Sequence, residues 1–228
     1  TMVFNERKEK LEIFGPEDAV EQITNFLRVG YYTLSFPIYI REMKNYETID
    51  FGDYTVTAVK TNHPVTNFAY VFKEKDRKRI SQELMEKYSL TSQDVEKIIK
   101  NGHVEKNGRK ILLDDISDGM RIGRKITYTG DTSPCQDIVK YGRESRILIH
   151  DSTVDSSLES KANEFGHSSA RQAAEIAREA NADMLILAHI SPRYRSGDVD
   201  ILEKEAKEIF RNTIVAKDFM ELQVNIKQ

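Results

Sequence analysis

Aspartate and histidine side chains follow the strand-like stretches 125–129, 146–149 and 184–188 of this 228-residue chain. They are Asp131, the adjacent pair His150 and Asp151, and His189. Ligands of α/β sheets bind at the carboxyl ends of strands, so these side chains could converge at one edge of a sheet. Imidazole and carboxylate are ligands that zinc, manganese and iron prefer, and a carboxylate can bridge two ions. The spacing favours a metal site, although a single histidine after a strand is more often a hydrogen-bonded structural residue.

The stretch TYTGDTSP at 127–134 contains the first of these carboxylates. Gly, Asp, Thr, Ser and Pro all favour turns, so a plain turn is one interpretation of this stretch. A turn that aims Asp131 at a ligand is the other. The stretch by itself does not decide between them.

The elements that would position these side chains follow a mixed order. An α/β pattern dominates after residue 125, and an Ala-rich helix there has Ser168 or Ser169 as its N-cap. In the first half, a loop containing His63 separates two strands rich in β-branched and aromatic residues. The predicted strands are 10–16, 32–43, 54–61, 68–74, 125–129, 145–153, 183–191 and 213–224, and the predicted helices are 17–30 (ending at Gly30), 168–182 and 200–210.

The composition is that of one globular domain, with 39% hydrophobic and 31% charged residues. No apolar run approaches the roughly 18 residues of a membrane span, and no signal peptide opens the chain. The single cysteine, Cys135, excludes an internal disulfide framework. These features predict a cytoplasmic protein with no membrane partner.

Residues 73–125 differ from the rest in charge. They contain 14 Lys and Arg against 10 Asp and Glu, a net charge of +4, whereas the whole chain carries −3 and the remaining residues therefore −7. A basic insert on an acidic body suggests a surface for a polyanion. A solvated helical segment with mixed charges is the alternative that charge alone leaves open.

Seven stretches spread over nearly the whole chain match a known pattern. They are KLEIFGP, TAVKTNHPVTNFAYVFKEKDR, TYTGDTSPC, ILIHDST, FGHSSARQAAEIAREA, LAHISPRY and TIVAKDFMEL. GDT or GHS alone is weak, but LAHISPRY following GHSSA at this distance is specific. With these stretches the chain resembles the ribonuclease Z family, tRNA 3′-processing endoribonucleases of the metallo-β-lactamase superfamily.

The resemblance implies a fold and a division of roles. The fold would be the α/β metallo-β-lactamase fold, an αββα sandwich, in a single domain over 1–228 with a tRNA-binding arm inserted at about 73–125. His63 would bind one zinc ion, His189 a second, and Asp131 would bridge both. His167 would contact the scissile phosphate and assist the leaving group as the catalytic residue.

The chain departs from the family pattern at two places that bear on activity. HDST at 150–153 replaces the usual His-Glu-Ala-Thr, so the acidic partner of His167 is one methylene shorter. None of the five histidines stands in a His-x-His-x-Asp-His run, which supplies most of the two-zinc site in the family. We therefore expect an N-terminally incomplete fold and a chain with little activity by itself.

The function that the resemblance implies is zinc-dependent endonucleolytic removal of the 3′ trailer from precursor tRNA by two-metal phosphodiester hydrolysis. Two Zn²⁺ ions per complete site are expected, with Mn²⁺ as an alternative, and a homodimer is implied. Two other hypotheses stay open at this point. One is a catalytically incomplete RNA- or partner-binding module, and the other is a different hydrolase of the same fold.

Overall fold

The computed structural model describes residues 2, 4–29, 34–194 and 198–225. The chain divides into two compact units. The first comprises Thr1–Lys73 and Lys125–Leu222, and the second comprises Glu74–Arg124 and Gln223–Gln228. Among the described helices, none is long and apolar enough to cross a membrane.

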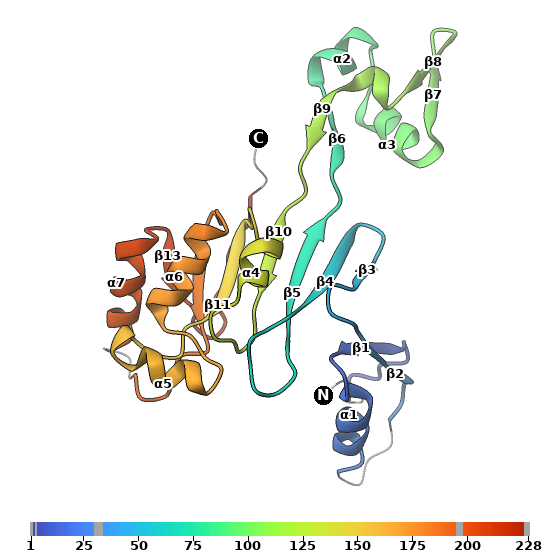
Figure 1. Cartoon of the computed structure of the whole chain (residues 1–228). Coiled ribbons are helices and arrows are strands. Elements are labelled where there is room, and N and C mark those ends of the chain that lie inside the picture. The colour runs from blue at the N-terminus through green and yellow to red at the C-terminus, as the bar shows by residue number, and fades with distance from the viewer. Residues whose placement is uncertain (1, 3, 30–33, 195–197, 226–228) are drawn as a thin grey trace. The chain divides into compact units, whose positions relative to one another are not determined.

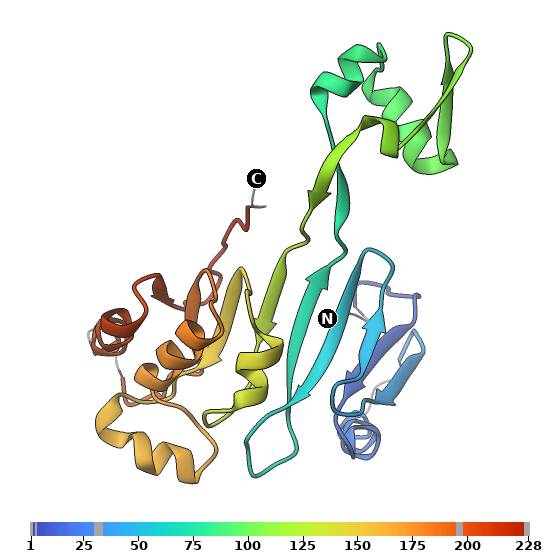
Figure 2. The ribbon, with the colours of Figure 1, turned by 45° about the horizontal axis from the view of Figure 1, so that its top comes forward.

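The first unit contains a seven-stranded sheet. Its strands are β3 (Thr48–Asp50), β4 (Tyr54–Lys60), β5 (Phe68–Glu74), β10 (Lys125–Tyr128), β11 (Ile147–Asp151), β12 (Leu185–Ala188) and β13 (Thr213–Val215). They lie in the order β13-β12-β11-β10-β5-β4-β3 (Figures 1 and 2). β10 to β13 pair in parallel, whereas β5 is antiparallel to β10 and β3 is antiparallel to β4. The carboxyl ends of β10, β11 and β12 therefore share one edge of the sheet.

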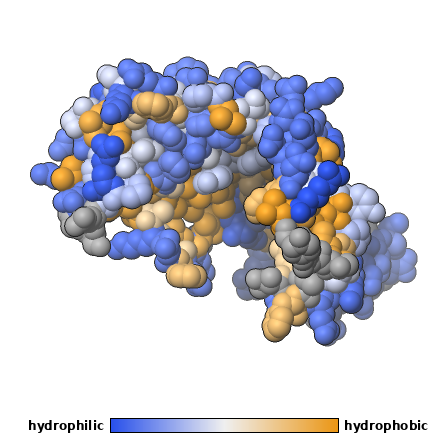
Figure 3. Space-filling view, turned by 90° about the horizontal axis from the view of Figure 1, so that it is seen from below, coloured by the Kyte–Doolittle hydropathy of each residue, from blue (hydrophilic) through white to orange (hydrophobic). Residues whose placement is uncertain are grey.

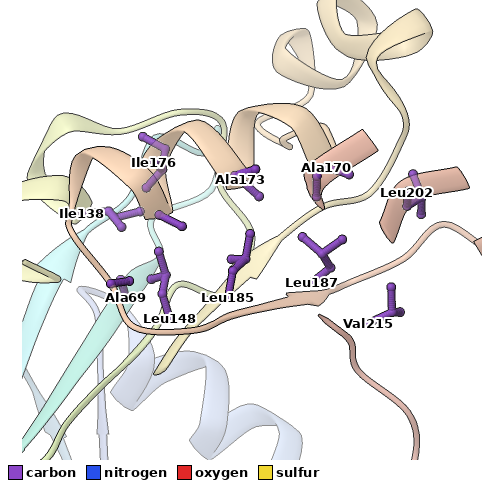
Figure 4. Packing of buried hydrophobic residues seen from close by; sticks show 14 of the residues in the cluster. Ala69, Ile138, Leu148, Ala170, Ala173, Ile176, Leu185, Leu187, Leu202 and Val215 are labelled. Carbon is purple, nitrogen blue, oxygen red and sulfur yellow. The ribbon is translucent and has the colours of Figure 1, made fainter. Parts of the chain in front are cut away.

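The main hydrophobic core lies between this sheet and three helices, α4 (Gln136–Tyr141), α6 (Ala170–Glu179) and α7 (Val199–Ile209). Figure 4 shows Ala173 and Ala170 of α6 next to Leu185 and Leu187 of β12, and all four side chains are fully buried. Alanine lets the helix backbone approach the sheet closely while leucine fills the space. Each buried leucine contributes about 1.5–3 kcal/mol to stability.

The start of α6 is fixed by a capping box. The Ser169 hydroxyl accepts from the backbone N–H of Gln172 at 3.1 Å, and the Gln172 side chain accepts from the Ser169 N–H. Ser168, the other predicted cap, instead donates its hydroxyl to the carbonyl of Thr132 at 2.6 Å. This bond ties the start of α6 to the loop that carries Asp131. A short helix, α5 (Glu159–Glu164), precedes α6, and 3-10 turns occupy Ser156–Leu158 and Asp114–Ile116.

Two strands end elsewhere than the sequence indicates. β11 includes His150 and Asp151, because its ladder continues through both residues to β12, so the prediction that they follow the strand was wrong. The strand predicted at 213–224 was too long. β13 ends at Val215, whose partner Leu187 is the last residue of β12 in that ladder.

A separate two-stranded parallel sheet lies near the beginning of the chain. It consists of β1 (Leu11–Gly15) and β2 (Ile38–Glu42), and α1 (Ala19–Leu27) packs beside it. β2 is shorter than the predicted 32–43, since Pro37 before it has no amide hydrogen to donate. Residues 32–33 and the predicted helix end at Gly30 lie outside the described residues.

The second unit has a small core of its own. Its elements are β6 (Arg77–Ile80), α2 (Gln82–Lys87), α3 (Ser92–Asn101), β7 (His103–Lys106), β8 (Arg109–Leu112) and β9 (Ser117–Arg121). β6 pairs with β9 and β7 with β8, both antiparallel. The core is formed by Leu90, Val95, Ile98, Ile111 and Ile116. The hydrogen bond from Lys106 lowers the pKa of Asp94, which completes the capping box of α3. His103 is the first residue of β7.

Candidate active site

The loop with His63 and the loop with Asp131 are joined by two hydrogen bonds. The Ser133 N–H donates to the Asn62 carbonyl at 3.0 Å, and the Asn62 N–H donates to the Thr132 hydroxyl at 3.1 Å. Asn62 directly precedes His63, and Thr132 and Ser133 directly follow Asp131. These bonds hold together two loops that are about 70 residues apart in the sequence.

Asp131 lies where the chain bends after β10. Gly130 has a φ of 61°, a conformation that glycine adopts without a Cβ penalty. The Asn67 amide donates to the Asp131 carbonyl at 2.8 Å and so holds the backbone of the bend. The carboxylate itself is 38% exposed and is the nearest carboxylate to His189. The bend thus leaves the carboxylate available at the carboxyl end of β10.

His189 follows β12 in a strained backbone conformation. Its φ is 58°, which is uncommon for a residue with a β-carbon and costs of the order of 1–3 kcal/mol. The imidazole Nε2 lies 3.4 Å from Oδ1 of Asp131. The strained turn therefore places one imidazole nitrogen beside the carboxylate.

His63 completes the group on the other side. Its Nδ1 lies 3.1 Å from the carbonyl oxygen of Val65, and its ring is 5.6 Å from that of His167 at an angle of 69°. The face of the molecule in Figure 3 carries apolar patches among polar residues. Near the site, Val65 and Phe165 are exposed by 69% and 61%. Val65 stands two residues after His63, and Phe165 stands two residues before His167.

His167 is held by a buried carboxylate. Its Nδ1 lies 2.8 Å from Oδ2 of Asp151, a side chain with no exposed surface. The shorter acidic residue at this position therefore does reach the histidine. The ring of His167 stacks on that of His189, with centroids 5.0 Å apart and planes 11° apart.

Asp151 also accepts three further hydrogen bonds. The Thr132 N–H donates to Oδ2 at 3.0 Å, and the Thr153 N–H and hydroxyl donate to Oδ1 at 3.0 and 2.7 Å. With the bond from His167, donors meet both carboxylate oxygens. A carboxylate that accepts this many bonds is fixed in one orientation. Asp151 thereby fixes the orientation of the His167 ring.

Two groups of side chains in the described part of the chain have ligand atoms close enough for a metal ion. One is His63, Asp131 and His167, and the other is Asp151, His167 and His189, with ligand atoms within 4.8 Å of one another in each group. In the second group Asp151, whose side chain is fully buried, is hydrogen-bonded to His167, and the Thr153 hydroxyl links it to His189. The first is partly exposed, and its mixture of imidazole and carboxylate fits zinc or manganese.

His150 is fully buried next to this group. Burial lowers the pKa of its imidazole, which is neutral at pH 7. Its Nδ1 lies 2.7 Å from the carbonyl oxygen of Asp151, so Nδ1 carries the hydrogen and donates. Its Nε2 has no hydrogen-bond partner among the described residues. His150 thus supports the backbone at Asp151 and stands apart from the open site.

Comparison with known proteins identifies the family. The chain is 42% identical to the ribonuclease Z of Thermoplasma acidophilum, over all of this chain and 74% of that protein. It is 39% identical to the ribonuclease Z of Archaeoglobus fulgidus, over all of this chain and 75% of that protein. The chain belongs to the ribonuclease Z family. A comparison with protein-family models finds no match.

Solved structures show the same fold at lower identity. The short form of human tRNase Z matches with a TM-score of 0.63 at 21% identity, over 98% of this chain and 71% of that chain. The metallo-β-lactamase fold protein YhfI from Bacillus subtilis matches with a TM-score of 0.58 at 22% identity, over 91% and 63%. This ribonuclease Z family member therefore has the metallo-β-lactamase fold, as predicted.

The structure brings all four predicted site residues of this family member together. His63, Asp131 and His167 form one group, and His189 lies beside Asp131 and stacks on His167. Their roles as ligands and catalyst stay predictions. The sequence interpretation missed Thr153, whose hydroxyl contacts both Asp151 and His189. The one sequence signal for Thr153 is its position two residues after Asp151.

Proposed function

We propose that the protein is a metal-dependent endoribonuclease that removes the 3′ trailer from precursor tRNA by phosphodiester hydrolysis. The pairing of His167 with buried Asp151 at 2.8 Å, beside the candidate ligand Asp131, is the observation that carries this proposal. A histidine oriented by a carboxylate next to a metal site suits hydrolysis with proton transfer. Membership of the ribonuclease Z family supports tRNA as the substrate.

The metal we propose is zinc, with two ions in the complete site and manganese as the alternative. His63 would hold one ion, His189 the other, and Asp131 would bridge them. Bound zinc would supply an activated water and neutralise charge on the phosphate oxygens. Each zinc ion usually has about three or four protein ligands, so full affinity needs ligands beyond these three side chains.

His167 would act on the substrate through Nε2. Asp151 accepts the hydrogen of Nδ1, which leaves Nε2 as the atom that gains or releases a proton. When protonated and placed beside the departing 3′ oxygen, His167 donates that proton as the phosphorus–oxygen bond breaks. The buried carboxylate stabilises the cation and keeps the ring in place.

The second unit would bind the body of the tRNA. Residues 74–124 of this unit carry 12 Lys and Arg against 10 Asp and Glu, and the adjoining Lys73 and Lys125 of the first unit raise the net charge of 73–125 to +4. A-form RNA is recognised mainly through its backbone and shape. Selection of tRNA would then depend on phosphate contacts that this unit makes. We also propose a homodimer, which light scattering of the purified protein would test.

The test is cleavage of a precursor tRNA with a 3′ trailer, in parallel with zinc analysis. In a protein with the complete zinc site, His167→Ala should reduce turnover about 10²–10⁴-fold and leave the zinc content unchanged. His103→Ala removes a histidine that is absent from both metal-candidate groups, so it is the control for the zinc content. Wild-type turnover of thioesters or lactones, with intact precursor tRNA, would favour another hydrolase of this fold.

A further inference from the structure

Thr153 lies between the buried carboxylate and the imidazole that faces Asp131. Its Oγ1 is 2.7 Å from Oδ1 of Asp151 and 2.9 Å from Nδ1 of His189. Its own backbone N–H donates to the same carboxylate oxygen at 3.0 Å, so the residue is held from two positions. The hydroxyl is therefore fixed at a distance that suits a hydrogen bond on each side.

The number of hydrogens decides the direction of both bonds. An ionised carboxylate only accepts, and a threonine hydroxyl has one hydrogen to donate. That hydrogen goes to Asp151, so the oxygen can only accept from His189. Nδ1 of His189 must then carry the hydrogen, and in the neutral ring the lone pair is at Nε2. This is the nitrogen that lies 3.4 Å from Oδ1 of Asp131.

We propose that Thr153 is a positioning residue that sets the tautomer of His189. Asp151 sets the tautomer of His167 directly, and it sets the tautomer of His189 through Thr153. Both stacked rings then have Nδ1–H on the side of Asp151 and a free Nε2. One buried carboxylate thereby prepares two imidazoles at once.

The free Nε2 has a consequence for cation binding. Nε2 of His189 and the carboxylate of Asp131 are both acceptors, and two facing acceptors 3.4 Å apart repel unless a cation lies between them. Second-shell hydrogen bonds of this kind commonly change metal affinity about 10–100-fold. The tautomer follows from hydrogen-bond geometry alone, whereas the effect on metal binding rests on the proposed function.

Nitrogen NMR of the imidazoles in the metal-free protein tests the tautomer directly. At a pH where the rings are neutral, the wild-type protein should show His189 with its hydrogen on Nδ1. Thr153→Val keeps the shape but removes the hydroxyl, and it should shift His189 toward the Nε2–H form. Thr153→Ser restores the hydroxyl and should restore the wild-type tautomer. A wild-type His189 with its hydrogen on Nε2, or a Val variant with an unchanged tautomer, would overturn the inference.

Zinc titration of the same proteins separates this inference from the proposed function. Thr153→Val should weaken zinc binding about 10–100-fold relative to wild type, and Thr153→Ser should recover most of it. Should the wild-type protein bind no zinc while the tautomer responds to Thr153 as described, the proposed metal site fails and the positioning role stands. If Thr153→Val unfolds, the Ser variant and the wild-type tautomer still decide the question.

Discussion

Gly166 lies so close to His63 that no side chain fits between them. A β-carbon on Gly166 would stand 2.7 Å from Cδ2 of His63 and 2.4 Å from Cδ of Pro64, and the glycine has a φ of 80°. Gly166→Ala should therefore push the His63 loop away and weaken metal binding. It should also lower the free energy of unfolding by more than the roughly 1–2 kcal/mol that a residue with a β-carbon costs in this backbone conformation. Thermal unfolding and zinc titration measure the two effects.

Gly52 supplies the matched control for this substitution. It has a φ of 87° and nothing within 4 Å of an added β-carbon. Gly52→Ala should show the backbone strain alone and leave zinc binding unchanged. Equal losses in both variants would show that the contact with His63 is unimportant.

Protonation of His150 should make the protein less stable as the pH falls. Burial lowers its pKa in the folded state below the ordinary value of 6.5, so below that pH the unfolded chain binds a proton that the folded chain does not. At pH values under about 6.5 the free energy of unfolding should decrease as the pH falls, and this group contributes a limiting slope of about 1.4 kcal/mol per pH unit.

Urea unfolding between pH 5 and 7.5 measures this slope in the wild type and in His150→Asn. The asparagine amide can still donate to the Asp151 carbonyl but has no proton to gain in this range. The variant should be less stable at pH 7 and should have a shallower pH dependence. Parallel curves would assign the pH dependence to other groups.

The 228-residue chain by itself should bind zinc weakly. Three side chains shared between two ions are fewer than the usual number of zinc ligands, although their types are suitable. Asp131→Asn should reduce the remaining affinity most, because it changes the residue that would bridge both ions. Elemental analysis after dialysis gives the metal content. Retention of two zinc ions per chain would mean that other residues contribute ligands.

Removal of residues 76–122 should weaken tRNA binding. The Glu74 N–H donates to the Arg124 carbonyl at 2.9 Å, so a short Gly-Ser linker can join the two ends. Fewer phosphate contacts should flatten the dependence of affinity on salt, since each contact releases counterions. Hydrolysis of a small phosphodiester should change little. An unchanged tRNA affinity would show that this segment does not bind the substrate.

Several features of the protein follow from the sequence alone, because they depend on neighbouring residues. β5 has the predicted bounds 68–74, and one of the two predicted serines caps α6. The places of Asp131 and His189 after predicted strands point to a site, whereas His63 and His167 are singled out only by the resemblance to the ribonuclease Z family. Strand limits were less certain, since β11 and β13 end where their partner β12 allows.

Only the tertiary structure decides how the site residues are held. The hydroxyl of Thr153 meets His189 across 36 positions, and Thr132 reaches Asp151 across 19. Such bonds depend on which strands become neighbours and in which register, and no local pattern contains that information. The same holds for Gly166, whose need to be glycine comes from His63, over 100 positions earlier. The sequence names the chemical groups, and the packing of distant segments determines which hydrogen each one carries and which atom it presents.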